Sequence, residues 1–123
     1  MAKILIVDDE PGIQVMIKAL LARAGHESVT ADNGVKALEF VKTDTFDLII
    51  TDLRMPHMDG LNLIRELVAL GSTIPVILVT GYASTESANE ALKLGVSGYL
   101  AKPFNIKELL STVEGTLGAG KNA

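Results

Sequence analysis

The sequence predicts an α/β protein in which a five-stranded, parallel, doubly wound sheet is covered by five helices. Short β-branched apolar runs alternate five times with stretches whose apolar residues recur at helical spacing. The runs at residues 3–7, 47–51 and 75–79 do not alternate apolar with polar residues, which is typical of strands buried on both faces of a parallel sheet. We expect the strand order 2-1-3-4-5, by analogy with the flavodoxin-like layout.

The first half of the chain contains three predicted strands and two predicted helices. Residues 3–7 form the first strand, and the helical pattern that follows ends at Gly25. Residues 28–31 form a weaker second strand. A turn signal at residues 33–34 opens a short helix, and residues 47–51 form the third strand.

The second half repeats this alternation. A third helix ends at Gly71, and residues 75–79 form the fourth strand. A fourth helix of small residues ends at Gly95, and residues 99–101 form the fifth strand.

The fifth helix should begin at a capping box. Asn105 is followed three positions later by Glu108, and apolar residues then recur at helical spacing as far as Leu117. We therefore expect one folded domain over residues 1–117, and a flexible tail or the start of a linker over residues 118–123.

Composition narrows the classes of function. The 123 residues suit one domain, and the absence of cysteine excludes disulfide scaffolds, thiol catalysis and cysteine-ligated zinc. The longest apolar runs have only four or five residues, so we expect no membrane span, and we expect a cytoplasmic protein. The net charge of −4 and the lack of a basic run argue against direct nucleic-acid binding.

Polar residues gather where the predicted strands end. Asp8 and Asp9 follow the first strand, Asp52 the third, Thr80 the fourth and Lys102 the fifth. In an open parallel sheet, ligands bind at the carboxyl ends of the strands, where the strand order reverses. We therefore expect three carboxylates, a hydroxyl and an ammonium group to converge there.

Such a cluster indicates a divalent cation and phosphoryl chemistry. Two like charges about 4 Å apart repel by roughly 4 kcal/mol at an effective dielectric of 20, and one lysine offsets only part of this. Mg²⁺ binds through one or two carboxylates and keeps waters that a phosphate can replace. A carboxylate beside it can then act as a nucleophile toward phosphorus.

Four motifs resemble the receiver domain of two-component response regulators, and together they are highly specific. The resemblance runs from about Lys3 to Leu117. The motifs are ILIVDDE at residues 4–10, DLRMPHMDG at 52–60, TGYA at 80–83 and GYLAKPF at 98–104.

The resemblance implies a role for each residue at the strand ends. Asp52 is the phosphoacceptor. Asp9 and Asp52 bind Mg²⁺ directly, together with the backbone carbonyl of Arg54, and Asp8 acts largely through water. Lys102 pairs with Asp52 and later with the phosphoryl group.

The resemblance also implies a switch. Thr80 moves its hydroxyl onto the phosphoryl group, and Tyr99 swings inward to fill the space that Thr80 leaves. The peptide bond between Lys102 and Pro103 is cis. The surface formed by the fourth helix, fifth strand and fifth helix changes in response. Two bulky residues, Arg54 and Tyr82, shield the phosphoryl group from water.

The implied partners are a sensor histidine kinase or phosphotransfer protein, which donates the phosphoryl group, and a downstream effector or output domain. The chain is then a signalling domain that promotes its own phosphorylation and dephosphorylation, and not an enzyme with an external substrate. We expect a monomer that can dimerise when phosphorylated.

Three alternatives remain. A haloacid dehalogenase-type phosphohydrolase needs a second Asp two residues after its nucleophile, where this chain has Arg54. An FMN-binding flavodoxin needs a phosphate loop rich in Ser, Thr and Gly after the first strand, where this chain is acidic. The third alternative is the same receiver within a longer regulator that has a DNA-binding or ATPase output domain.

Three further residues carry structural expectations. Met16 should lie in the core, and His26 should lie exposed at the edge of the second strand. His57 lies in the loop near the predicted site, and we assign it no role.

Overall fold

The computed structural model describes residues 2–55, 57–81 and 84–121. Strands and helices alternate along the whole of this part of the chain. Their bounds are β1 Lys3–Val7, α1 Pro11–Arg23, β2 Glu27–Ala31, α2 Gly34–Thr43, β3 Leu48–Asp52, α3 Gly60–Ala69, β4 Val76–Thr80, α4 Thr85–Lys93, β5 Gly98–Ala101 and α5 Ile106–Lys121.

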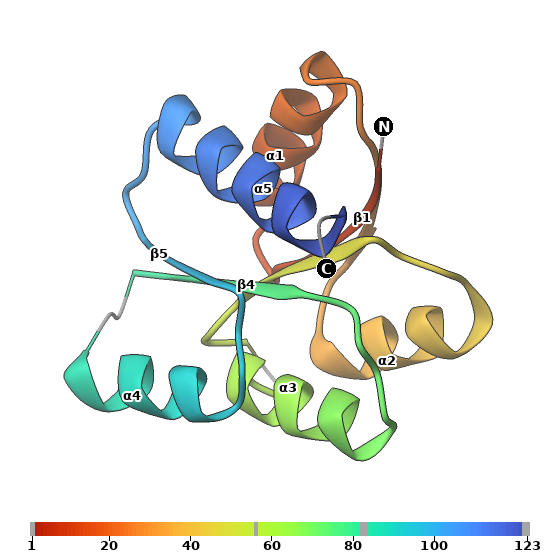
Figure 1. Cartoon of the computed structure of the whole chain (residues 1–123), viewed down its shortest axis with the longest axis vertical. Helices are drawn as coiled ribbons and strands as arrows, with labels where there is room; N and C mark the ends of the chain where they lie inside the picture. Colours follow the sequence, from red (N-terminus) through yellow and green to blue (C-terminus); the bar gives the residue numbers. More distant parts are fainter. Residues whose placement is uncertain (1, 56, 82–83, 122–123) are drawn as a thin grey trace.

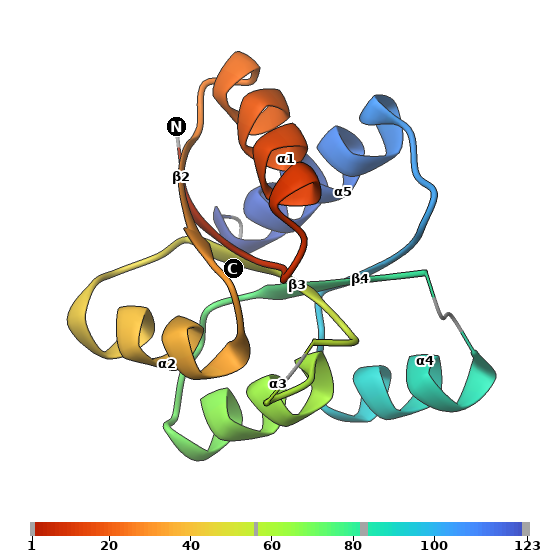
Figure 2. The same ribbon diagram turned by 180° about the vertical axis from the view of Figure 1, so that it is seen from behind.

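The strands form one parallel sheet in the order β2-β1-β3-β4-β5, which confirms the predicted doubly wound architecture. Helices α1 and α5 cover one face, and α2, α3 and α4 cover the other (Figure 1). The view from behind shows the same three layers (Figure 2). The strand order reverses between β1 and β3, so the carboxyl ends of these two neighbouring strands lie side by side.

The core is divided into two apolar layers by the sheet. One layer lies under α2, α3 and α4 and includes Leu5, Ile49 and Leu78, whereas the other lies under α1 and α5 and includes Ile4 and Ile50. Each fully buried Leu or Ile side chain contributes about 1.5–3 kcal/mol relative to exposure. Because both faces of the central strands are packed in this way, polar side chains are confined to the strand ends and the loops.

Side-chain caps fix where several helices begin. The carboxylate of Asp59 accepts a hydrogen bond from the backbone N–H of Asn62 at 2.8 Å and caps α3. At α5, the backbone N–H of Glu108 donates to the Asn105 side chain at 2.8 Å, and the Asn105 N–H donates back to the Glu108 carboxylate at 3.4 Å. The capping box expected from the sequence is therefore present.

Helix α5 extends further than the sequence indicated. Its apolar pattern ends at Leu117, but the helix continues through the glycine-containing segment to Lys121. Residues 118–121 are thus helical, where we expected the start of a flexible tail, and residues 122–123 lie outside the described part of the chain. The predicted domain boundary itself stays a prediction.

Two expectations about single residues are wrong. Met16 is 40 % exposed on α1, because Ile17 and Leu21 supply the buried face of this helix. His26 is buried: its Nδ1 accepts a hydrogen bond from the backbone N–H of Ala2 at 3.1 Å, and its Nε2 lies 2.7 Å from a carboxylate oxygen of Glu114 on α5. His26 therefore ties α5 to the start of β1.

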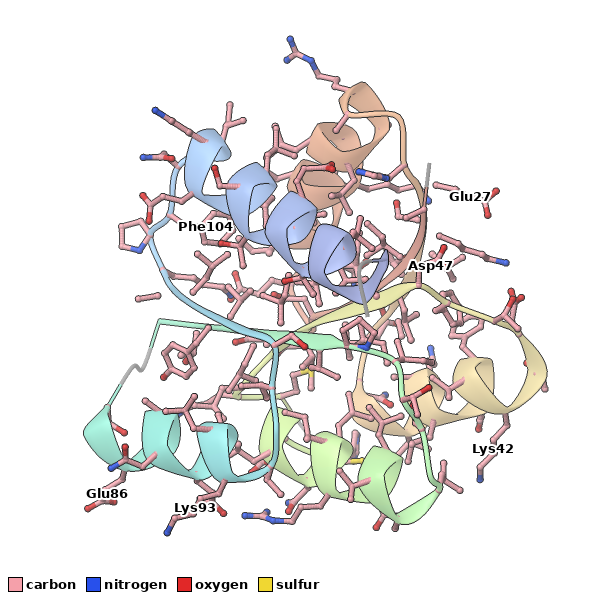
Figure 3. The ribbon with its side chains drawn as sticks, in the orientation of Figure 1. Glu27, Lys42, Asp47, Glu86, Lys93 and Phe104 are labelled. Atoms are coloured by element: carbon pink, nitrogen blue, oxygen red, sulfur yellow. The ribbon has the colours of Figure 1, made fainter. Side chains whose placement is uncertain are left out.

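The outer surfaces of the helices are charged. Lys42 on α2, and Glu86 and Lys93 on α4, point away from the sheet (Figure 3). Phe104, between β5 and α5, packs against the core layer under α1 and α5. Within the described residues, no helix combines the length and apolarity needed to cross a membrane.

Gly60 allows α3 to start directly against the end of β3. A Cβ added at Gly60 would lie 2.3 Å from the backbone oxygen of Asp52 and 3.0 Å from the Cα of Leu53. Backbone atoms cannot yield as a flexible side chain can, so any larger residue must displace the end of the strand.

We therefore predict that Gly60→Ala lowers the free energy of unfolding by about 1–3 kcal/mol through overpacking. Gly12→Ala in α1 is the matched control, because a Cβ there has no neighbour within 4 Å. It should be neutral or stabilise the fold by about 0.4–1 kcal/mol. Urea unfolding followed by circular dichroism measures both, and equal stabilities of the two variants would contradict the close contact at Gly60.

Candidate functional site

Asp8 follows β1 and is fixed by four hydrogen bonds. Its backbone N–H donates to the carbonyl of Ala31 at 3.1 Å, which extends the pairing of β1 with β2. Its backbone carbonyl accepts from the side chain of Gln14 at 2.5 Å. Its Oδ1 accepts from the backbone N–H of Glu10 at 2.9 Å, and its Oδ2 lies 3.3 Å from Nζ of Lys102. With only 2 % of its surface exposed, Asp8 has a single defined orientation.

Asp52 ends β3 and is also buried, with 7 % of its surface exposed. Its Oδ1 accepts a hydrogen bond from the backbone N–H of Leu53 at 2.8 Å. The chain then returns, because the N–H of Gly60 donates to the carbonyl of Leu53 at 2.7 Å. The loop between β3 and α3 is therefore closed at its base, directly beside the Asp52 carboxylate.

Lys102 brings these two carboxylates together. Its backbone N–H donates to the carbonyl of Thr80 at 2.7 Å, which continues the pairing of β5 with β4 beyond Ala101. Its ammonium nitrogen lies 3.3 Å from Oδ2 of Asp8 and 3.4 Å from Oδ2 of Asp52. One cation thus contacts the ends of two neighbouring strands. The peptide bond between Lys102 and Pro103 is cis, as the resemblance implied.

Burial and nearby charges shift the pKa values of Asp52 and Lys102. Desolvation raises the pKa of the Asp52 carboxyl above its usual 3.8, and the nearby charge of Asp8 adds to the shift, while the Lys102 ammonium opposes it. Desolvation alone would lower the pKa of Lys102, but the attraction of Asp52 and Asp8 outweighs it and raises that pKa above 10.5. Burial is therefore the main reason that the charged form of Asp52 is disfavoured, and the attraction of Lys102 exceeds the repulsion of Asp8.

The acidic loop after β1 has the chemistry of a hard-cation site. Carboxylate oxygens of Asp8, Asp9 and Glu10 lie within 4.8 Å of one another, and the side chains of Asp9 and Glu10 are exposed. Carboxylate oxygens are the ligands that Mg²⁺ and Ca²⁺ prefer. Asp52 is not part of this group of three, but it shares the ammonium of Lys102 with Asp8. The residues present therefore fit a divalent cation.

Thr80 and Tyr99 lie on the same face of the sheet. Leu78 pairs with Tyr99 and Thr80 pairs with Ala101 in the register of β4 and β5. Since side chains two residues apart on a strand share a face, Thr80 lies on the side of Leu78 and Tyr99. Thr80 is fully buried, whereas Tyr99 is partly buried against the core layer under α2, α3 and α4.

Arg54 and His57 are both exposed in the loop between β3 and α3. His57 has a left-handed backbone, at a φ of 70°. Tyr82 lies outside the described residues.

Sequence reasoning missed two polar side chains that touch predicted site residues. Gln14 donates to Asp8, as described above, and also to the carboxylate of Asp32 at 3.0 Å. The hydroxyl of Ser87 on α4 lies 3.0 Å from the hydroxyl of Tyr99. A signal existed only for Ser87, because Ser84 and Ser87 have the spacing of a capping box at the start of the fourth helix.

Comparison with curated proteins finds relatives of two sizes. The chain is 42 % identical over 114 residues to the transcriptional regulatory protein ZraR of Escherichia coli (strain K12), covering 93 % of this chain but only 26 % of ZraR. It is 34 % identical over 112 residues to the sporulation initiation phosphotransferase F of Bacillus subtilis (strain 168), covering 91 % of this chain and 90 % of that protein. The chain thus spans about a quarter of the length of ZraR.

Solved structures and a family model agree with these relatives. The crystal structure of a CheY-like response regulator receiver domain protein from Methanospirillum hungatei JF-1 matches with a TM-score of 0.94 and 31 % identity, over 99 % of this chain and 98 % of that one. The receiver domain of the Francisella response regulator 1452 matches with a TM-score of 0.92 and 34 % identity, over 98 % and 99 % of the two chains. The model of the response regulator receiver domain matches residues 4–114. The chain therefore belongs to the family of response regulator receiver domains.

Proposed function

We propose that this receiver domain is a phosphorylation-controlled switch that accepts a phosphoryl group on Asp52 from a histidine kinase or a phosphotransfer protein. The observation that carries the proposal is the single ammonium group of Lys102 beside both the Asp8 and Asp52 carboxylates. Receiver domains of this family pair with histidine kinases and output domains. We propose that this exchange takes place in the cytoplasm.

The chemistry begins with the Asp52 carboxylate as nucleophile. One of its oxygens attacks the phosphorus of a phosphohistidine, the phosphorus–nitrogen bond breaks, and its electron pair returns to the imidazole nitrogen. The N–H of Leu53 holds Oδ1 and so orients the carboxylate. The ammonium group of Lys102 lies close enough to Asp52 to stabilise the negative charge on the oxygens of the transferred phosphoryl group. Hydrolysis of the acyl phosphate later restores Asp52, and the domain's own residues promote both steps.

Asp8, Asp9, Asp52 and the backbone carbonyl of Arg54 are the proposed Mg²⁺ site. The cluster of carboxylate oxygens from Asp8, Asp9 and Glu10 supports the Asp8 and Asp9 part of this donor set. When bound, Mg²⁺ supplies positive charge that neutralises the carboxylates and the phosphoryl oxygens.

The output of the switch is a changed surface on α4, β5 and α5. Thr80 moves toward the phosphoryl group, and the Tyr99 ring occupies the space that this movement opens. The shared face of Thr80 and Tyr99 on adjacent strands supports this route. Two discrete packings of one ring are the kind of element that can carry such a change.

The lengths of the relatives support two domain contexts for the switch, one joined to an output domain and one free-standing. ZraR, a transcriptional regulatory protein, is about four times as long as the matched region, whereas phosphotransferase F is matched over nearly its whole length. The first setting places this domain before an output domain, and the second has it act on a separate effector. The reading frame that encodes the chain distinguishes them.

The first prediction concerns the acceptor. With Mg²⁺ and a small acyl phosphate as donor, wild-type protein should gain one base-labile phosphoryl group, and Asp52→Asn should gain none. Asp47→Asn is the matched control, since Asp47 precedes the same strand at its opposite end and should leave the adduct unchanged. Intact-protein mass spectrometry measures the adduct, and an unchanged adduct on Asp52→Asn would place the acceptor elsewhere.

The second prediction concerns the metal. Mg²⁺ at about ten times its dissociation constant should raise the free energy of unfolding by about 1.4 kcal/mol, because it binds only the folded site. Asp9→Asn should lose most of this gain. NaCl at matched ionic strength controls for screening of the carboxylates. Equal gains from Mg²⁺ in wild type and Asp9→Asn, measured by urea unfolding, would rule out this site.

The third prediction concerns pH. Because the pKa of Asp52 is raised on folding, its contribution to stability is most favourable below pH 3.8 and is lost as pH rises through the folded value. Asp52→Asn removes this loss. Without Mg²⁺, the free energy of unfolding of the variant should therefore rise relative to wild type from about pH 4 upward and then level off.

Urea unfolding at several pH values tests this dependence. Lys102→Met should deepen the loss in otherwise wild-type protein, because two buried carboxylates then lack their cation. If the difference in free energy of unfolding between Asp52→Asn and wild type does not vary with pH, the raised pKa of Asp52 is contradicted.

A further inference from the structure

Helix α4 is attached to the sheet by few apolar contacts. Among the α4 residues whose side chains are described, Ala91 alone is buried, and Leu92 is 68 % exposed. Helix α3, on the same face, buries five residues: Gly60, Leu61, Leu63, Ile64 and Leu67. Polar contacts therefore contribute a larger part of the interaction that holds α4 against the domain than they do for α3.

Among the α4 side chains that the structure describes, two make polar contacts with neighbouring elements. Glu90 forms an ion pair with Arg65 of α3, and both side chains are nearly half exposed, so solvent weakens this pair. Ser87 lies in the first turn, where its hydroxyl is 3.0 Å from the hydroxyl of Tyr99 on β5 in a partly buried position. The Ser87 contact is the one that reaches the proposed switch residue.

The Ser87 hydroxyl has other hydrogen-bond neighbours besides Tyr99. A serine hydroxyl has one hydrogen to donate and two lone pairs to accept with. The backbone N–H of Ser84 donates to Oγ of Ser87 at 3.3 Å, and Ser87 can donate its own hydrogen to the backbone carbonyl of Ser84 at 3.2 Å. The hydroxyl of Ser84 also lies 3.0 Å from Oγ of Ser87. Either hydroxyl, that of Ser87 or that of Tyr99, can therefore be the donor in the bond that joins them.

The Ser87 hydroxyl therefore takes part in two interactions at once. Ser87 completes the capping box of α4, together with Ser84, and it holds the end of the Tyr99 side chain. If the Tyr99 ring leaves its place against α4, its hydroxyl must find another partner and Ser87 loses one. Movement of the ring and order in the first turn of α4 are thus linked through one oxygen atom.

We propose that Ser87 is a positioning residue of the switch, which holds the Tyr99 ring against the first turn of α4 in the unphosphorylated domain. This inference rests on the proposed function, because it deals with the equilibrium that phosphorylation shifts. A hydrogen bond of this kind changes an equilibrium by about twofold to tenfold. Removing it should raise the population of the phosphorylated-like arrangement by that factor before any phosphoryl group is added.

The variants separate the contact to Tyr99 from the helix cap. Ser87→Ala removes both the hydrogen-bond partner of the Tyr99 hydroxyl and one half of the capping box. Ser84→Gly is the matched control, because it removes the other half of the box at little cost in helix stability and leaves Ser87 beside Tyr99. Tyr99→Phe keeps the ring without the hydroxyl, and Ser87→Thr restores a hydroxyl at the same place.

The first measurement is a double-mutant cycle on unfolding equilibria, which needs no phosphorylation. Ser87→Ala and Tyr99→Phe should be non-additive, with an interaction equal to a twofold to tenfold change in the unfolding equilibrium constant. Ser84→Gly and Tyr99→Phe should be additive. An additive Ser87–Tyr99 cycle, or an equal interaction in both cycles, would overturn the proposal.

The second measurement follows the ring itself by NMR in the unphosphorylated protein. The chain has two tyrosines, so Tyr82→Phe identifies the Tyr99 ring signals. In Ser87→Ala, these signals and the α4 amides should move toward their positions in phosphorylated wild type, and Ser87→Thr should restore them. A coupled cycle with unmoved signals would overturn the role in switching.

The two proposals fail in different ways. Absence of phosphorylation on wild-type Asp52 would reject the proposed function and leave the cycle between Ser87 and Tyr99 intact. Normal phosphorylation with an additive cycle would reject the positioning role alone.

Discussion

The ammonium group of Lys102 lies between the carboxylates of Asp8 and Asp52, at the point where the strand order of the sheet reverses. These carboxylates end neighbouring strands that are buried on both faces, so neither can turn out into solvent. Their repulsion is of the order of 4 kcal/mol at about 4 Å and an effective dielectric of 20. The attraction of Lys102 opposes this repulsion, and burial is the main cause of the raised pKa of Asp52. Two carboxylates nevertheless contact one ammonium group, so a formal negative charge remains. The fold thus holds an excess of negative charge at the place where a cation and a phosphoryl group are proposed to bind.

The packing that stabilises the sheet also confines its reactive polar side chains to the ends of the strands. Ile4, Ile50 and Ile77 leave no room for polar groups along the strands, and the two core layers close both faces. Polar side chains are tolerated only where the strands end, and the hydrogen bonds of the flanking backbone then orient them, as Leu53 does for Asp52. Close backbone approach at Gly60 completes this arrangement, because it returns the chain immediately beside the carboxylate. Position and orientation of the site are therefore consequences of core packing.

Features of the fold and of the site could be predicted where they depend on residues close together in the sequence, and not where they depend on contacts between distant residues. Strand ends are local in sequence, so the chain alone indicated that Asp8, Asp52, Thr80 and Lys102 meet at one edge, and the structure brings them there. The burial of His26 depends on Glu114, which is 88 residues away, and no local pattern signals it. Met16 fitted the helical spacing of α1, but the spacing does not say how wide the buried stripe is.

The roles of these residues have a different basis from their positions. Membership of the receiver family rests on the whole chain, whereas the acceptor, the metal ligands and the switch residues come from a resemblance carried over one position at a time. Geometry limits what those roles can be. Asp52, the proposed acceptor, is buried beside the ammonium group of Lys102, while Asp9, a proposed cation ligand, is exposed.

Weak packing of α4 would allow the proposed switch to alter the surface that this helix presents. Elements with few buried apolar contacts open at low free energy, and conformational change draws on such elements. Ala91 is the buried anchor among the described α4 side chains, so we expect that repositioning α4 requires less free energy than repositioning α3. Better packing of α4 would stabilise the domain, but it would also raise the free energy needed to move the helix. The small, polar composition of α4 therefore suits a helix whose position can change, whereas the apolar face of α3 holds that helix in place.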